Sequence, residues 1–126
     1  YTMAKFGMSM CTLGMSAEFA AGGIAVTSLW PLTAIDPAAV RNLLGGAGVA
    51  AMSRSPEIMA DAAHAVLTRP ARATTGNFFI DEEVLREEGV SDFSRYAPGA
   101  KGPLAGDFFV PDEVFARTDT KVAGLF

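Results

Sequence analysis

The chain has 126 residues, half of them hydrophobic, and a formal net charge of -4. This length suits one modest domain with a core of its own. The basic residues do not cluster, which argues against nucleic acid as a partner, and no apolar run is long enough to suggest a membrane span. A single cysteine, Cys11, excludes an internal disulfide and a cysteine-based metal site and fits a cytoplasmic protein.

The first part of the chain predicts a helix, a strand and a second helix. Good helix formers without proline extend over residues 1–21, with apolar side chains on more than one face, so we expect a buried helix that ends at Gly22-Gly23. Residues 24–30 predict a strand that is covered on both faces, as parallel strands are. Asp36 and Pro37 are typical of the start of a helix, so a loop and then a helix should follow.

The remainder predicts two further helices and one strand before an irregular tail. Ser55-Pro56 is typical of a helix start, and the helix should cover residues 56–68. A strand is expected at residues 77–80, followed at Asp81 by a short acidic helix that ends at Gly89. From residue 91 onward periodicity is weak, and we expect a tail that wraps a surface, with one or two helical turns near residues 111–116.

The order helix, strand, helix, helix, strand favours an α/β fold with a parallel sheet. Two strands are too few for such a sheet, because the strand at residues 24–30 needs neighbours on both flanks. The sequence therefore predicts half of a larger α/β domain, with the other half upstream of Tyr1.

Tyr1 and Lys5 form a possible acid/base pair at the start of the first helix. Residues four apart project from one face of a helix, so both side chains can point into the same cleft. A nearby ammonium favours the ionised phenolate, and a tyrosine so tuned can exchange a proton with a carbonyl or hydroxyl oxygen while a hydride is moved. Because this spacing is common in helices, an ordinary helix face is the alternative.

The motifs in order resemble the second half of the short-chain dehydrogenase/reductase family. The resemblance begins at Y-T-M-A-K, which is similar to the family's Tyr-x-x-x-Lys motif, and continues through G-I-A-V-T-S-L-W-P, A-D-A-A-H-A-V-L and T-G-N-F-F-I-D. The segments W-P-x-T-A-I and E-E-G-V-x-D-F-x-x-Y-A are most similar to the family's hydroxysteroid dehydrogenase-like branch. The resemblance covers nearly the whole chain. It implies a fragment, the C-terminal half of a Rossmann-type doubly wound parallel sheet within one domain.

The resemblance also implies roles for individual residues. Tyr1 matches the family's proton donor and acceptor, and Lys5 matches the lysine that tunes the tyrosine and hydrogen-bonds the nicotinamide ribose. The loop after the strand, whose backbone lies against the nicotinamide in the family, is matched by Pro31, Leu32, Thr33 and Ala34. Leu32 replaces the usual glycine and Asp36 stands where many members have a threonine, so Thr33 would serve instead.

Residues 36–53 match the family's substrate lid, and Gly45-Gly46-x-Gly48 within them is compatible with hinging. A plain flexible loop is the alternative. The lid's apolar residues suggest an apolar pocket; they are Leu43, Leu44, Val49 and Met52.

The function that the resemblance implies is an oxidoreductase that moves a hydride between NAD or NADP and the hydroxyl or carbonyl of a small apolar substrate, with Tyr1 as general acid/base. The family's phosphate-binding glycine motif, active-site asparagine and serine lie upstream of the tyrosine. The fragment alone is therefore expected to be inactive, and a catalytically silent binding or interaction module is the alternative. Cofactor choice stays open, because the residues that decide it lie upstream as well.

Other residues have simpler interpretations. His64 is expected to be a partly exposed structural residue, and Cys11 a buried small hydrophobe. The acidic residues of 81–88 predict a solvated helix face rather than a cation site. The methionines of the first helix suit a core or a subunit interface, and the resemblance implies a homo-oligomer in which this helix packs against its counterpart.

Overall fold

Two pairs of parallel strands with helices around them make up the fold, which a computed structural model describes for residues 1–35, 48 and 50–124. β1 (Ser28–Trp30) pairs with β2 (Phe78–Ile80), and β3 (Leu104–Ala105) pairs with β4 (Val122–Ala123). The predicted α/β class and parallel pairing are confirmed. The helix expected after Asp36 and most of the predicted lid, residues 36–47 and 49, lie outside the described residues.

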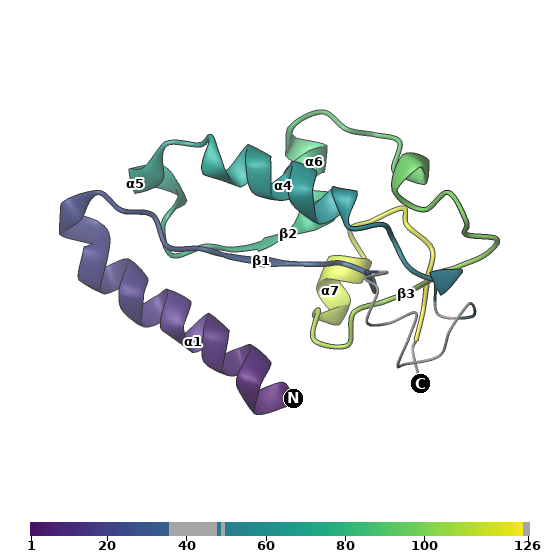
Figure 1. Cartoon of the computed structure of the whole chain (residues 1–126), viewed down its shortest axis with the longest axis horizontal. Coiled ribbons are helices and arrows are strands. Elements are labelled where there is room, and N and C mark those ends of the chain that lie inside the picture. Colours follow the sequence, from purple (N-terminus) through teal and green to yellow (C-terminus); the bar gives the residue numbers. More distant parts are fainter. Residues whose placement is uncertain (36–47, 49, 125–126) are drawn as a thin grey trace.

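Helices cover the two faces of the β1–β2 pair from opposite sides (Figure 1). α4 (Glu57–Leu67) and α6 (Asp81–Glu87) lie on one face, where Leu29 and Phe79 pack into their cluster of buried apolar side chains. These two strand residues are paired in register, and strand residues alternate between faces. α1 (Thr2–Phe19) lies on the other face, where the Thr12 hydroxyl is 2.7 Å from the Ser28 hydroxyl.

The first helix has the predicted length but not the predicted burial. It continues into a 3₁₀ turn (Ala20–Gly22) and ends at Gly23, whose φ of 70° is in the left-handed region, as the glycine pair indicates. Within the described part of the chain Thr12 is its one buried residue, whereas Met3 is 88% exposed and Cys11 is exposed. The prediction of a buried helix and a buried Cys11 is therefore wrong for this chain, because the strand pair covers only one side of α1.

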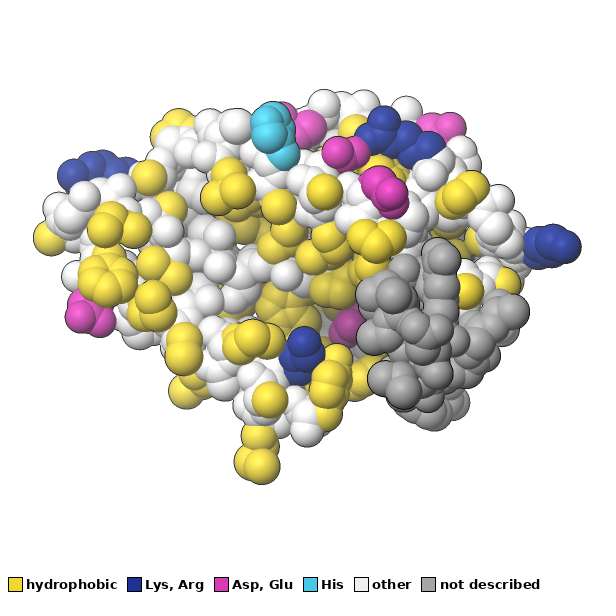
Figure 2. Space-filling view, in the orientation of Figure 1, with side chains coloured by type: hydrophobic (Ala, Val, Ile, Leu, Met, Phe, Trp, Pro, Cys, Tyr) yellow, Lys and Arg dark blue, Asp and Glu magenta, His cyan; other side chains and the backbone are white. Residues whose placement is uncertain are grey.

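Exposed hydrophobic side chains spread over much of this face of the molecule, including the part that α1 occupies (Figure 2). Those more than two-fifths exposed on α1 are Met3, Phe6, Met8, Met10, Leu13 and Met15. Within the described ranges no helix combines the length and apolar character needed to cross a membrane.

β1 is shorter than the strand predicted at residues 24–30. The backbone N–H of Val26 donates to the Thr75 hydroxyl, and its carbonyl accepts from the N–H of Gly76. These partners follow α5 (Ala71–Thr74), a short helix that the sequence did not predict. The loop after α5 thus takes the hydrogen bonds of the strand's first half, and the ladder begins at Ser28. The strand predicted at 77–80 and the helix predicted at 56–68 are confirmed to within a residue.

The tail from residue 91 contains more structure than predicted. α7 (Asp112–Phe115) confirms the expected helical turn, but the turn η2 (Ser94–Tyr96) and the pair β3–β4 were missed, because elements of two or three residues leave no periodicity to detect. The tail lies against the loop that follows β1. The N–H of Asp107 donates to the Leu32 carbonyl at 3.0 Å, and the N–H of Ala34 donates to the Ala105 carbonyl at 2.7 Å.

The acidic helix α6 is not the solvated face that its sequence predicts. Asp81 is fully buried and Glu82 is 1% exposed, because both carboxylates have partners inside the fold. Glu87 and Glu88 are exposed as expected, and so is His64. Among the residues that the structure describes, no group of histidine, cysteine, aspartate or glutamate side chains could hold a metal ion.

Candidate active site

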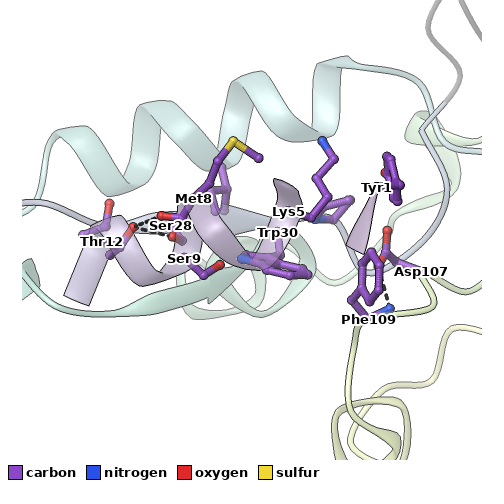
Figure 3. Close-up of a pocket in the computed structure, with 12 residues that line it drawn as sticks. Tyr1, Lys5, Met8, Ser9, Thr12, Ser28, Trp30, Asp107 and Phe109 are labelled. Atoms are coloured by element: carbon purple, nitrogen blue, oxygen red, sulfur yellow. Dashed lines mark hydrogen bonds between the residues drawn. The ribbon is translucent and has the colours of Figure 1, made fainter. Parts of the chain in front are cut away.

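Tyr1 and Lys5 share a face at the start of α1. The N–H of Lys5 donates to the Tyr1 carbonyl at 3.0 Å, which is the first turn of the helix. Their side chains therefore lie side by side, and the Lys5 Nζ is 5.3 Å from the centre of the Tyr1 ring (Figure 3). Tyr1 is 76% exposed within this chain. Within this chain the Tyr1 side chain is thus exposed to solvent and lies next to a cation.

The two side chains border a cavity of about 350 Å³. Three separate segments meet there: the first turns of α1, the strand β1 with Pro31 after it, and the tail. The carboxyl end of β1 contributes Trp30 and Pro31, and the tail contributes Asp107 and Phe109. The cavity runs between α1 and β1 from Thr27 to Pro31, so one end of it lies at the carboxyl end of β1. Ligands of α/β proteins bind beyond the carboxyl ends of parallel strands.

Besides Lys5, four loop residues are predicted to contact a cofactor, and they are placed differently from one another. Pro31 lines the cavity, whereas Leu32 and Thr33 are buried beside it. The N–H of Leu32 donates to the Asp81 Oδ1 at 2.8 Å, and the N–H of Ala34 is used by the tail. The Thr33 hydroxyl is fully buried and has no hydrogen-bond partner among the described residues. Contact of this loop with a cofactor stays a prediction.

Phe109 is a wall of the cavity that the sequence did not reveal. Its ring is nearly parallel to that of Tyr1, with 5.9 Å between the centres and 20° between the planes. It also meets Phe6 and Trp30 edge-on, at 5.2 and 6.1 Å between centres. Such aromatic contacts favour a fixed relative placement. The only signal in the sequence is the Phe108-Phe109 pair in an otherwise glycine- and proline-rich tail.

Asp107 brings a carboxyl group into the same cavity. Its Oδ1 accepts a hydrogen bond from the N–H of Phe109 at 3.0 Å, which fixes the turn that presents the ring. Burial raises the pKa of Asp107, although the Phe109 N–H and the positive charge of Lys5 act in the opposite direction. The Lys5 charge therefore acts on the Asp107 carboxyl group, which the tail contributes to the same cavity (Figure 3).

A second cavity, of about 430 Å³, adjoins the first one between α1, the β1–β2 pair and α7. Trp30 and Phe109 line both cavities, and the second is otherwise mainly apolar. Glu83 and Arg117 form an ion pair of 2.8 Å on its border. The Tyr1 and Lys5 cavity and the apolar cavity thus lie next to each other, with Ser9, Trp30 and Phe109 as shared walls.

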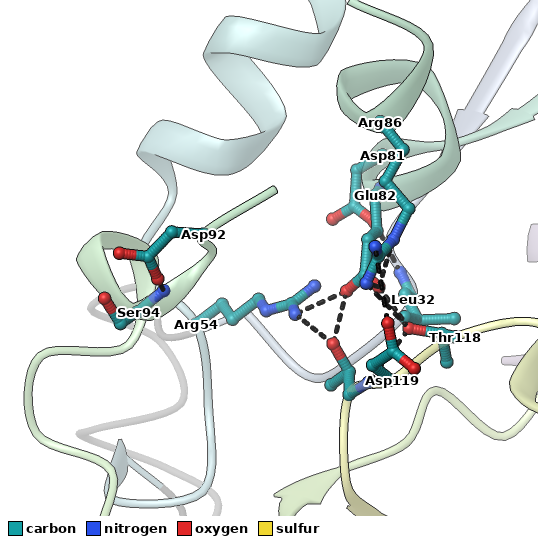
Figure 4. Close-up of polar contacts among 10 residues, drawn as sticks. Leu32, Arg54, Asp81, Glu82, Arg86, Asp92, Ser94, Thr118 and Asp119 are labelled. Carbon is teal, nitrogen blue, oxygen red and sulfur yellow. Dashed lines mark hydrogen bonds and ion pairs between the residues drawn. The ribbon is translucent and has the colours of Figure 1, made fainter. Parts of the chain in front are cut away.

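Behind the site, a buried carboxylate joins α6 to two other segments (Figure 4). Glu82 pairs with Arg54 at 2.5 Å, and both side chains are 1% exposed. The hydroxyls of Thr118 and Thr120 also donate to the Glu82 carboxylate, the second at 2.7 Å. Burial acts to raise the pKa of Glu82, but these hydroxyl hydrogen bonds and the charge of Arg54 outweigh it and lower that pKa.

The neighbouring Asp81 shows the opposite behaviour. Burial raises its pKa to about 6, although its Oδ1 accepts hydrogen bonds from the N–H groups of Leu32 and Glu82. Its Oδ2 has no hydrogen-bond partner among the described residues. The sequence pattern Asp-Glu-Glu gave no sign of this difference, because it depends on Arg54, Thr118 and Thr120, which are far away in sequence.

Comparison with known proteins points to one family. The chain is 54% identical over 112 residues to hydroxysteroid dehydrogenase-like protein 2 of Xenopus tropicalis and 49% identical over 112 residues to that of Homo sapiens. In both cases the match covers 89% of this chain and 26% of the relative. The chain thus spans about a quarter of the length of the curated relatives it matches. No family model matches it.

Solved structures give the same picture. A protein from Xanthomonas campestris, assigned as a dehydrogenase, and a short-chain dehydrogenase from Mycobacterium thermoresistibile each superpose with a TM-score of 0.76 at 48% identity. Each match covers 88% of this chain, and respectively 40% and 39% of the solved chain. The fold described above is therefore a part of the fold of these proteins.

Proposed function

Because the chain belongs to the short-chain dehydrogenase/reductase family, we propose that the whole protein, meaning this chain with the parts of the fold that it does not cover, is an NAD- or NADP-dependent oxidoreductase. Its substrate is a small apolar molecule with a hydroxyl or carbonyl group. Tyr1 is the general acid/base and Lys5 its neighbour in the site. The single observation that carries the proposal is the cavity along β1 that Tyr1, Lys5 and Pro31 share at the carboxyl end of that strand.

The residues present are compatible with a nicotinamide cofactor. Pro31 borders the cavity, and Thr33 keeps a buried hydroxyl without a partner among the described residues, which a polar group of a ligand could use. Lys5 would hold the ribose, and the loop of Pro31 to Ala34 would lie along the ring. When bound, the cofactor supplies or accepts the hydride.

The residues of this chain transfer the proton of the reaction. In the direction of reduction, the phenolic O–H of Tyr1 donates its proton to the substrate's carbonyl oxygen as that oxygen gains negative charge. In the direction of oxidation, Tyr1 takes the proton of the hydroxyl group. Lys5, as a cation beside the phenol, stabilises the phenolate that remains after donation.

The second cavity supports an apolar substrate. It opens next to Phe109 and Trp30, and its border is mainly apolar apart from the Glu83–Arg117 ion pair. A molecule whose oxygen lies at Tyr1 can place its hydrocarbon part there and remove that surface from water.

Replacement of the phenol tests the proposal. In the whole protein, Tyr1→Phe should lower the reduction of apolar ketones, such as 2-decanone and acetophenone, by about 10²–10⁴-fold while cofactor affinity stays nearly unchanged. The matched control is Tyr96→Phe, which removes the same hydroxyl from a buried tyrosine that hydrogen-bonds Asp61 outside the site. Activity that survives Tyr1→Phe would contradict the role of Tyr1. A wild-type protein that binds the cofactor and reduces none of the ketones would instead be the silent binding module.

We also propose that the whole protein is a homo-oligomer in which α1 takes part. The support is the row of exposed apolar side chains on α1, with Met3 at 88% and Met10 at 68% exposed. Sedimentation of the whole protein as a single copy would contradict this.

A further inference from the structure

The tail reaches the Tyr1 cavity through a chain of contacts that begins at Glu82. Thr118 and Thr120 donate their hydroxyls to the buried Glu82 carboxylate. Just beyond them, β4 pairs with β3, and the N–H of Gly106 donates to the Ala123 carbonyl at 3.0 Å. Asp107 follows at once, so the anchoring point and the cavity wall are joined by a short hydrogen-bonded segment.

The same carboxylate holds the other side of the site. Arg54, its ion-pair partner, donates its backbone N–H to the Ala34 carbonyl at 2.8 Å. One residue before Glu82, Asp81 accepts the N–H of Leu32. The start of α6 therefore fastens the loop after β1 and the tail to the same point (Figure 4).

The Glu82 carboxylate is held by more hydrogen bonds than a surface ion pair provides. Its oxygens accept from two threonine hydroxyls and from the side chains of Arg54 and Arg86, the latter at 2.9 Å. A carboxylate with this many donors in a buried place is held in one geometry. Glu82 is joined through Thr118, Thr120 and the β3–β4 pair to Asp107 and Phe109, which border the cavity of Tyr1 and Lys5.

We propose that Glu82 is a positioning residue for substrate binding: by anchoring Thr118 and Thr120 it fixes the tail so that Phe109 forms the apolar wall opposite Tyr1. The inference rests on the proposed oxidoreductase function for its substrate. Phe109 is the residue that touches the substrate's apolar part, and Glu82 acts through it. Neither residue takes part in proton transfer.

The test releases the tail without breaking the buried ion pair. In the whole protein, Thr118→Val with Thr120→Val removes the two hydroxyls, keeps the side-chain shape and leaves Glu82 paired with Arg54. The hydrogen bonds that these hydroxyls accept from Arg54, from Arg86 and from the N–H of Thr120 are lost as well. Hydrogen exchange of the Asp107 and Phe109 amides should become at least about tenfold faster, the low end of what one hydrogen bond to a charged group contributes. KM for 2-decanone should rise about fivefold while kcat stays within about twofold, since Tyr1 is untouched.

The matched control is Thr74→Val. Thr74 is also buried and loses a hydrogen bond to the Pro70 carbonyl, but it lies in α5, at the end of the β1–β2 pair away from α7 (Figure 1). Neither tail exchange nor KM should change. In a Phe109→Leu background the threonine pair should raise KM no further, because the wall through which Glu82 acts is already altered.

Each other outcome overturns the inference. Unchanged exchange at Asp107 and Phe109 would show that Glu82 does not hold the tail, and this readout needs no turnover. Faster exchange with an unchanged KM would show that the tail is not part of the substrate site. If Tyr1→Phe abolishes reduction while the threonine variants behave like Thr74→Val, the positioning role fails and the proposed function stands. If Tyr1→Phe keeps full activity, the proposed function itself fails.

Discussion

The two faces of the β1–β2 pair are held in different ways. On the face of α4 and α6, side chains distant in sequence meet in a closed apolar cluster beside a buried ion pair. On the face of α1, Thr12 is the one helix residue buried within the described ranges, and the helix end is fixed by the backbone of Gly23. Buried long-range contacts thus define the first face. The second face has fewer long-range contacts, among them Thr12 with Ser28, and local backbone preferences set the end of its helix. Substitutions should separate the two.

The largest effect is expected at the buried ion pair. Arg54→Met leaves the Glu82 carboxylate buried without its main cation and should lower the free energy of unfolding of the whole protein by about 3–5 kcal/mol in urea. Arg95→Met is the matched control, because the Arg95–Asp61 pair is exposed, and it should cost only a small fraction of that. If both substitutions lowered the free energy of unfolding equally, the buried Arg54–Glu82 pair would contribute no more to stability than an exposed ion pair.

The next effect is a pH dependence that comes from Asp81. Its pKa is raised to about 6 in the folded protein and is near 3.8 when unfolded, so the folded state binds the proton more tightly. The stability that Asp81 contributes is present below pH 4 and is lost as the pH rises from about 4 to about 6. Two units correspond to about 3 kcal/mol.

Asp81→Asn isolates this contribution. The amide oxygen can still accept the N–H groups of Leu32 and Glu82, and the side chain no longer ionises. Relative to the wild type, the variant should become more stable by up to about 3 kcal/mol between pH 4 and pH 6, as urea unfolding at each pH would record. The low pKa of Glu82 acts with the opposite sign but is common to both proteins, so the difference excludes it. A difference that does not vary with pH would contradict the account.

The smallest effect is expected on α1, where two glycines should respond with opposite signs. At Gly23, with φ at 70°, an added Cβ would also lie 3.2 Å from the Arg72 guanidinium, so Gly23→Ala should cost about 1–2 kcal/mol. At Gly14 nothing lies within 4 Å of an added Cβ, and Gly14→Ala should stabilise the helix by about 0.5–1 kcal/mol. A shared sign in urea unfolding would show that packing, rather than the backbone, governs this face.

The sequence predicted the features that depend on neighbouring residues and missed those that depend on contacts between distant ones. The end of α1 at Gly23 and the positions of α4 and β2 depend on residues within a few positions of one another, and local signals located them. The burial of Glu82 depends on Arg54 and Thr120, which are 28 and 38 positions away. No local pattern carries such a contact, and an acidic triplet at a helix start is more often solvated.

The candidate site divides in the same manner. Tyr1 and Lys5 stand four positions apart, so the spacing and the family resemblance identified them together, and the structure places both on one cavity. Asp107 and Phe109 reach that cavity only because the tail folds back over the loop after β1. Their contribution follows from tertiary contacts, and a tail with weak periodicity does not reveal it.

The hydroxyl contact between Thr12 and Ser28 attaches α1 to β1 at a point far from Tyr1, so a small rotation of the helix about this contact displaces Tyr1. Tyr1 stands eleven positions before this pivot, about 16 Å along the helix axis at about 1.5 Å per residue. A tilt of about 4° around the pivot would therefore swing Tyr1 through about 1 Å, and an error of that size can cost an enzyme about a hundredfold in rate. Phe6 lies about halfway between Tyr1 and Thr12, and its ring contacts Trp30 and Phe109. These contacts limit the tilt of α1 and so fix the position of Tyr1.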